Sequence, residues 1–154
     1  WRIANAIVDT RAQSPLTRTS ELAQLIKKTA PQREIKKHPA TRSFQAIRMY
    51  INSELEQIET VLSASLDVLA EGGRLVVISF DSLEDRLVKQ FMKKHSQGKQ
   101  VPRGMPISED ELNKGKKLLL VGRKSKPSKA EVEDNIRSRS SVLRIAERLA
   151  RNTD

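Results

Sequence analysis

Four hydrogen-bonding side chains recur at helical spacing in the first third of the chain. They lie within residues 38–54, whose sequence is HPATRSFQAIRMYINSE, on one border of an apolar stripe: Thr41, Gln45, Arg48 and Asn52. The stripe continues through residues 44–69 at steps of three or four, which predicts one helix face buried against a core. The polar border could line a substrate cleft, or Arg48 and Gln45 could simply extend along the rim of the core.

A second candidate site follows the run Arg74-Leu-Val-Val-Ile-Ser-Phe80. The run is too short for a helix and rich in β-branched residues, which predicts a central strand buried on both faces of a parallel sheet. The next residues, Ser82-Leu-Glu-Asp85, match a helix N-cap pattern with Ser82 as the cap. Residues 79–82 would then lie at the carboxyl end of a strand, where open α/β sheets bind ligands.

The remaining pattern predicts the elements that position these residues. A first helix should end at Ser14-Pro15, and a second, capped by Thr19, should run to Pro31. One long helix should begin at residue 40 or 41 and end near Gly72-Gly73. Residues 117–122 should form a strand, followed by a Lys/Ser/Pro linker to about residue 131, and residues 142–146 fit either a helix or a strand.

Composition limits the classes of protein that fit. The 154 residues allow one domain, or one with a small appendage. There is no cysteine and there are only two histidines, so we expect no metal site. No apolar run approaches the roughly 20 residues that a membrane helix needs, so we expect no membrane partner and a cytosolic protein. The first residue is Trp1, which suggests a fragment or a processed chain.

The net charge of +10 is concentrated at the two ends of the chain. Residues 1–50 and residues 114–154 each carry +7, whereas residues 51–80 carry −4 and residues 81–113 are neutral. This distribution is typical of a protein that binds a polyanion, most simply nucleic acid. The lysine-rich run at residues 114–129 is more typical of a solvated loop than of a specific contact. Five aromatic residues are too few for a row of base-stacking platforms.

Five sequence motifs follow one another along the chain: residues 38–48 (HPATRSFQAIR), 52–55 (NSEL), 73–75 (GRL), 78–89 (ISFDSLEDRLVK) and 137–140 (RSRS). Together they closely resemble the bacterial 16S ribosomal RNA cytosine-N4 methyltransferase family, known as MraW. The resemblance covers essentially the whole chain and corresponds to the C-terminal half of that family's protein.

The resemblance implies an α/β fold, namely the C-terminal half of a class I (Rossmann-like) S-adenosylmethionine-dependent methyltransferase with part of an inserted helical domain. Residues 1–37 would end the helical, RNA-recognition insertion, and residues 38–154 would belong to the methyltransferase domain. Residues 74–80, 117–122 and about 141–147 would be its fifth, sixth and antiparallel seventh strands. The resemblance therefore favours a strand at residues 142–146.

The implied cofactor is S-adenosylmethionine, and the implied partner is 16S ribosomal RNA in the small ribosomal subunit. The family holds its cofactor on a Gly-rich turn and on an acidic residue after earlier strands. No Gly-x-Gly pattern opens a helix here, so we expect no cofactor-binding residue in this chain and no activity from the chain alone.

The reaction that the resemblance implies suggests roles for individual residues. Asp81, with Ser79 and Ser82, would be catalytic, because a carboxylate can accept a hydrogen bond from the N4 amino group and orient it. The family usually has His where this chain has Asp81, and Asp81 could instead only cap the next helix. Phe80 could stack on an extruded base or pack in the core. The substrate-binding candidates are His38, Thr41, Arg42, Gln45, Arg48, Asn52, Phe80, Arg86, Arg137 and Arg139.

Two other functions compete with an enzyme. One is a non-catalytic basic module that binds ribosomal RNA or assists ribosome assembly. The other is a DNA-binding regulator, but no helix pair has helix-turn-helix spacing. His38 likewise has two interpretations, since it could contact a ribose or cap its own loop.

Overall fold

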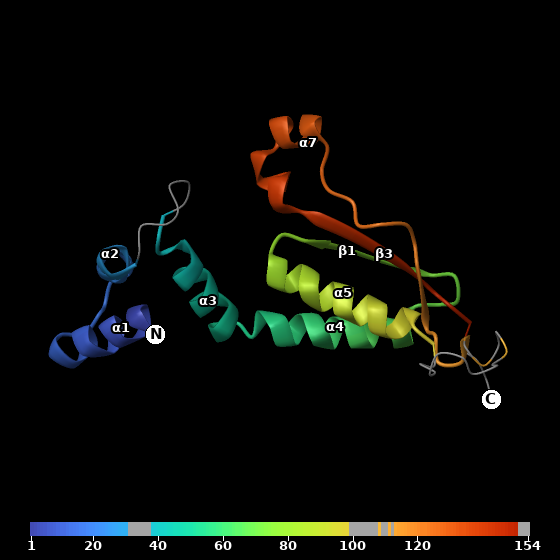
Figure 1. Ribbon diagram of the computed structural model, residues 1–154, viewed down its shortest axis with the longest axis horizontal. Helices are drawn as coiled ribbons and strands as arrows, with labels where there is room; N and C mark the ends of the chain where they lie inside the picture. The colour runs from blue at the N-terminus through green and yellow to red at the C-terminus, as the bar shows by residue number, and fades with distance from the viewer. Residues whose placement is uncertain (31–37, 99–107, 109–110, 112, 151–154) are drawn as a thin grey trace. The chain divides into compact units, whose positions relative to one another are not determined.

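The computed structural model describes residues 1–30, 38–98, 108, 111 and 113–150, in a mixed α/β arrangement (Figure 1). They divide into two units, Trp1–Ser53 and Glu54–Asp154. The predicted domain boundary after residue 37 falls at the end of residues 31–37, outside the described part of the chain, and it stays a prediction. No helix in the described ranges is long and apolar enough to cross a membrane.

The described residues of the first unit form three helices: α1 (Arg2–Gln13), α2 (Thr19–Thr29) and α3 (Thr41–Ile51). Helix α1 ends before Ser14-Pro15, as predicted. The prediction of Thr19 as the N-cap of α2 is wrong, because Arg18 is the cap residue. Glu21 Oε2 instead accepts the backbone N–H of Thr17 and of Arg18, each at 3.0 Å, and so satisfies the start of the helix.

The single long helix predicted from about residue 41 to residue 72 is wrong. It is divided into α3 and α4 (Glu54–Val68), and Ser53 adopts the left-handed conformation between them, with φ of 49°. Asn and Ser are poor helix formers whose side chains compete for backbone groups, which favours a break at Asn52-Ser53. The apolar spacing continues across this break, but Ile51, which belongs to the stripe predicted to be buried, is 72% exposed.

Three strands form the sheet of the second unit: β1 (Arg74–Ser79), β2 (Leu118–Leu120) and β3 (Val142–Arg148). Their order is β1-β3-β2, and β3 is antiparallel to both neighbours, so β1 and β2 run parallel to each other. The strand favoured at the C-terminal end is confirmed. The prediction of β1 as a central strand is wrong for this chain, because among the described residues β1 pairs with β3 alone and lies at an edge.

The linker predicted up to about residue 131 is also more structured than its composition suggests. Ser125 pairs with Leu143 through both backbone groups, at 3.0 and 2.9 Å, and so extends the sheet. Helix α7 (Lys129–Asp134) starts within the predicted linker, capped by the Ser128 side chain. A short 3₁₀ helix, η1 (Ile136–Ser140), then leads into β3.

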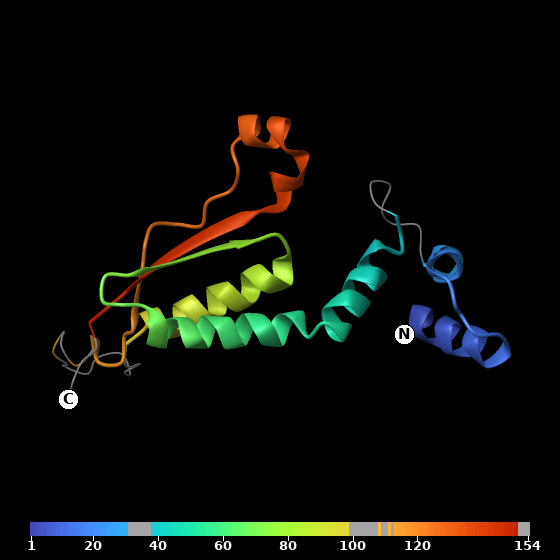
Figure 2. The ribbon, with the colours of Figure 1, turned by 180° about the vertical axis from the view of Figure 1, so that it is seen from behind.

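Helices α4 and α5 (Ser82–Ser96) lie side by side against one face of the sheet (Figures 1 and 2). The core between these layers consists of six buried residues: Leu62, Leu66, Val88, Met92, Leu118 and Ala146. On the opposite face, Val76, Ile78 and Leu119 are between 54% and 59% exposed. The period of two along each strand thus separates a buried face from an uncovered apolar one.

Candidate functional site

The turn from β1 to α5 is held by two carboxylates. Glu84 Oε2 accepts the backbone N–H groups of Phe80 (3.0 Å) and Asp81 (3.1 Å), and Asp81 Oδ1 accepts the N–H of Leu83 (2.8 Å). This reciprocal capping box makes Asp81 the N-cap of α5. The prediction of Ser82 as the cap is therefore wrong, and the interpretation of Asp81 as a cap is confirmed.

Sequence reasoning missed Glu84, although the signal was present. Glutamate three residues after an aspartate is the spacing of a capping box, and it places Asp81 at the N-cap one residue before Ser82. The Ser-x-x-Asp spacing from Ser82 to Asp85 competed with it. The end of β1 decides which residue is the cap. The N–H groups of Phe80 and Asp81 no longer pair in the sheet and need another acceptor, which Glu84 supplies.

The three neighbours of Asp81 differ in exposure. Ser79 ends β1 and is 4% exposed, whereas Ser82 is exposed and Phe80 is 58% exposed. The alternative that Phe80 packs in the core is therefore wrong for this chain. An exposed aromatic ring beside a carboxylate can stack on a flat ring while the carboxylate accepts hydrogen bonds. The catalytic roles of Asp81, Ser79 and Ser82 stay predictions.

The sheet register brings a second segment to the same end of the unit. Ser79 is paired with Val142, the first residue of β3, and η1 precedes β3 directly (Figure 1). Arg137 and Arg139 lie in η1, and Arg86 lies in the second turn of α5. The structure thus places three of the predicted RNA-binding arginines on elements that begin or end beside the carboxyl end of β1.

An ion pair that the sequence analysis did not single out stabilises this end of the unit. Arg144 Nε and Nη2 donate to Asp85 Oδ1 and Oδ2 at 2.6 and 3.0 Å, which joins β3 to the first turn of α5. The side chains are only 17% and 20% exposed. The hydrogen bonds from Arg144 lower the pKa of Asp85 below its ordinary value despite partial burial, and the charges of Arg144, Lys124 and Lys89 act in the same direction.

Replacing Asp85 with asparagine is expected to lower the free energy of unfolding by about 1–3 kcal/mol at neutral pH, because the largely buried guanidinium of Arg144 loses its charged acceptor. The depressed pKa means that the contribution of Asp85 is fully present above its unfolded-state pKa of about 3.9 and is lost as pH falls through the lower folded value. Urea unfolding of wild type and D85N from pH 3 to pH 7 measures this. The difference in unfolding free energy should shrink below about pH 4, and a constant difference across that range would contradict the assignment.

The predicted site residues of the first unit lie on or beside α3. His38 Nδ1 accepts the backbone N–H of Ala40 at 3.2 Å, so the interpretation of His38 as a loop cap is confirmed. Thr41, Arg42, Arg48 and Asn52 are exposed, and Gln45 is half-buried. These residues and the β1–α5 turn belong to different units. That the polar border of α3 lines a substrate cleft therefore stays a prediction.

The described residues do not form a cradle for S-adenosylmethionine. The β1–α5 turn contains no glycine, and its N–H groups are already bonded to Glu84 and Asp81. Gly72, Gly115 and Gly122 have positive φ, but none lies in a strand-to-helix turn. Within the described ranges no group of three or more His, Asp or Glu side chains is placed to hold a metal ion.

Comparison with known proteins gives one consistent result. Residues 1–149 match the MraW methylase family. The chain is 63% identical over 148 residues to a protein of Idiomarina loihiensis named "Ribosomal RNA small subunit methyltransferase H", and this match covers 96% of the chain and 47% of the relative. Proteins of the same name from Shewanella amazonensis and Shewanella denitrificans are 57% and 58% identical, with the same coverage. The chain spans about half the length of these relatives, and it belongs to the MraW methylase family.

Proposed function

We propose that the protein is an S-adenosylmethionine-dependent methyltransferase that methylates the exocyclic N4 of a cytosine in the decoding centre of 16S ribosomal RNA. The single observation that carries the proposal is the 63% identity to a relative named as a small-subunit ribosomal RNA methyltransferase. Because the chain spans 47% of that relative, it would supply only part of the enzyme. Such an enzyme would meet its RNA in the cytoplasm.

The sheet supports the proposed fold. An antiparallel strand between two parallel ones, in the order β1-β3-β2, is compatible with the fifth, seventh and sixth strands of a class I methyltransferase. In that arrangement residues 79–82 lie at the carboxyl edge, where α/β sheets bind their ligands. The exposed apolar side chains of β1 and β2 are compatible with a larger protein that covers them.

The residues of the β1–α5 turn would act on the base. The cytosine N4 amino group is a hydrogen-bond donor, and carboxylates are its common protein partner. Asp81 would accept one N4 hydrogen and orient the amino group, and Phe80 would stack on the base after it leaves its neighbours. Arg86, Arg137 and Arg139 would bind phosphates, and the exposed polar residues of α3 would contribute to RNA recognition.

The cofactor would be held by residues outside this chain, because the described residues form no cradle for it. S-adenosylmethionine would supply the methyl group, and the chain by itself would be inactive. The lack of a cofactor cradle among the described residues is also compatible with the second candidate function, a basic module that binds ribosomal RNA without catalysis.

A direct assay separates the two functions. The full-length protein is incubated with S-adenosylmethionine and small ribosomal subunits from cells that lack the modification, and the RNA is digested and analysed by mass spectrometry. We expect N4-methylcytidine at one site with the full-length protein and none with the 154-residue chain. Tight RNA binding by the full-length protein without any N4-methylcytidine would refute the proposed methyltransferase activity and support the non-catalytic RNA-binding module.

A further inference from the structure

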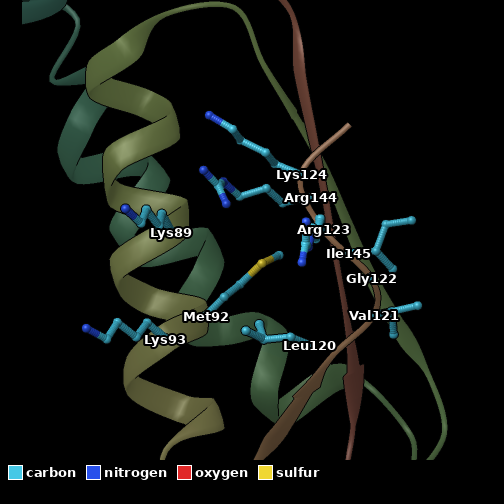
Figure 3. Close-up of a pocket in the computed structure, with 10 residues that line it drawn as sticks. All are labelled: Lys89, Met92, Lys93, Leu120, Val121, Gly122, Arg123, Lys124, Arg144 and Ile145. Carbon is cyan, nitrogen blue, oxygen red and sulfur yellow. The ribbon is translucent and has the colours of Figure 1, made fainter. Parts of the chain in front are cut away.

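A cationic pocket lies between α5 and the segment that follows β2 (Figure 3). Its volume is about 180 Å³. The apolar part of its lining includes Met92 and Leu120, and the lining also includes five basic residues: Lys89, Lys93, Arg123, Lys124 and Arg144. They come from α5, from the segment after β2 and from β3, so the folded unit brings together charges from three separate parts of the sequence.

The positive charge of this pocket is poorly compensated. Arg144 is bonded to Asp85, but Lys89, Lys93, Arg123 and Lys124 form no salt bridge with any residue in the described ranges. Lys89 and Lys124 are also close enough to Asp85 to lower its pKa, so this carboxylate is shared by several cations. Like charges held together repel one another, and an anion bound among them relieves that repulsion.

The sheet register relates the pocket to the β1–α5 turn. Leu120 lies opposite Ala146, which pairs with Leu75, so the β2 and β3 residues of the pocket lie level with Leu75 to Val77 of β1. Strands β1 and β2 are parallel, and the pocket includes Leu120 and the residues that follow it at the carboxyl end of β2. Arg144 is paired with Val77, two positions along β3 from Val142, the partner of Ser79. The Asp85–Arg144 bonds then connect the pocket directly to the first turn of α5.

Size and chemistry together indicate a phosphate group. A volume of about 180 Å³ is below the roughly 300–1,000 Å³ of ordinary small-molecule sites, so a whole nucleotide or cofactor fits poorly. Lysine ammonium groups bind phosphate as mobile point charges, and Arg123 adds a planar fork of donors.

We propose that this pocket binds a backbone phosphate of the RNA strand near the nucleotide presented to the β1–α5 turn. The proposal rests on the proposed function, because it takes RNA as the source of the phosphate. The lysine-rich run at residues 114–129, interpreted from composition as a solvated loop, thereby contributes a specific contact through Lys124. Binding one phosphate here fixes the register of the strand without reading its sequence.

The test uses the full-length protein with Lys89, Lys93 and Lys124 replaced together by glutamine. The matched control replaces three exposed lysines of the same unit outside the pocket: Lys94, Lys126 and Lys129. Affinity for a 16S ribosomal RNA fragment is measured at several salt concentrations, with thermal unfolding as a check on folding. The pocket variant should bind at least about 10-fold more weakly at low salt, and the slope of log K against log salt should fall by about 0.7–0.9 for each phosphate that the protein no longer neutralises.

Equal losses in the pocket and control variants would overturn the proposal, because they would reflect net charge alone. A second arm titrates inorganic phosphate at constant ionic strength. Phosphate binding to wild type combined with unchanged RNA affinity of the pocket variant would identify a free-anion site and also overturn the proposal. Because RNA affinity is read separately from methylation, a wild-type protein that forms no N4-methylcytidine but needs the pocket for RNA would refute the enzyme and retain the pocket.

Discussion

Replacing Asp81 with asparagine in the full-length protein is expected to lower the rate of cytosine N4 methylation about 100-fold, the lower end of the usual contribution of a positioned acid–base group. Asparagine and aspartate are equally good N-caps, so the bond to the Leu83 N–H is kept. Stability should therefore fall by less than about 1 kcal/mol, the most that a carboxylate at an exposed helix start commonly adds through the dipole. The rate loss would then report on the carboxylate itself.

The companion variant D81A separates the two roles of this residue. It removes both the cap and the carboxylate, so it should also lose about 0.5–2 kcal/mol of stability. Single-turnover methylation at saturating protein and cofactor, with urea unfolding of each variant, measures both effects. Wild-type turnover by D81N would leave Asp81 as a helix cap and remove it from the proposed chemistry.

The second large effect concerns the core. Replacing Leu118 with alanine in this chain should destabilise it by about 2–5 kcal/mol, because the side chain is 1% exposed and packs between α5 and the sheet. The neighbouring Leu119 points to the opposite face and is 54% exposed. The same substitution there should change stability by no more than about 0.5 kcal/mol.

This pair of variants tests which face of β2 the helices cover. Equilibrium urea unfolding gives the free energy of each variant, and an unchanged m value shows that the extent of unfolding is the same. A loss at Leu119 as large as the loss at Leu118 would contradict the register in which Leu120 pairs with Ala146.

Local chemistry in the sequence was sufficient for several elements. Ser14-Pro15 ends α1, and the β-branched run at residues 74–79 forms β1. Thr41 begins α3 as predicted, and Gly72, with φ of 76°, provides the turn before β1. In each case one residue type or one short pattern has few conformations open to it, so neighbouring residues alone decide the outcome.

The order of the sequence motifs was enough to recognise the family. The periodicity of apolar residues, in contrast, could not decide the secondary structure of the C-terminal segment. Residues 142–146 fit a helix or a strand until they are paired with β1 on one side and β2 on the other. The same limit applies to the long helix predicted from residue 41, since the apolar spacing continues across Asn52-Ser53. Periodicity alone cannot detect a helix break that preserves the spacing of the apolar residues.

For the candidate site, too, some features follow from the sequence alone and others from the tertiary structure. The sequence by itself determined that Ser79 to Ser82 lie where a strand ends and a helix begins, because strand and cap signals are local. Only the tertiary structure decided that Arg144 binds Asp85, 59 residues away, and that α5, the end of β2 and β3 surround one cationic pocket. Those contacts depend on strand order and register, which are set by the packing of distant segments into a common core.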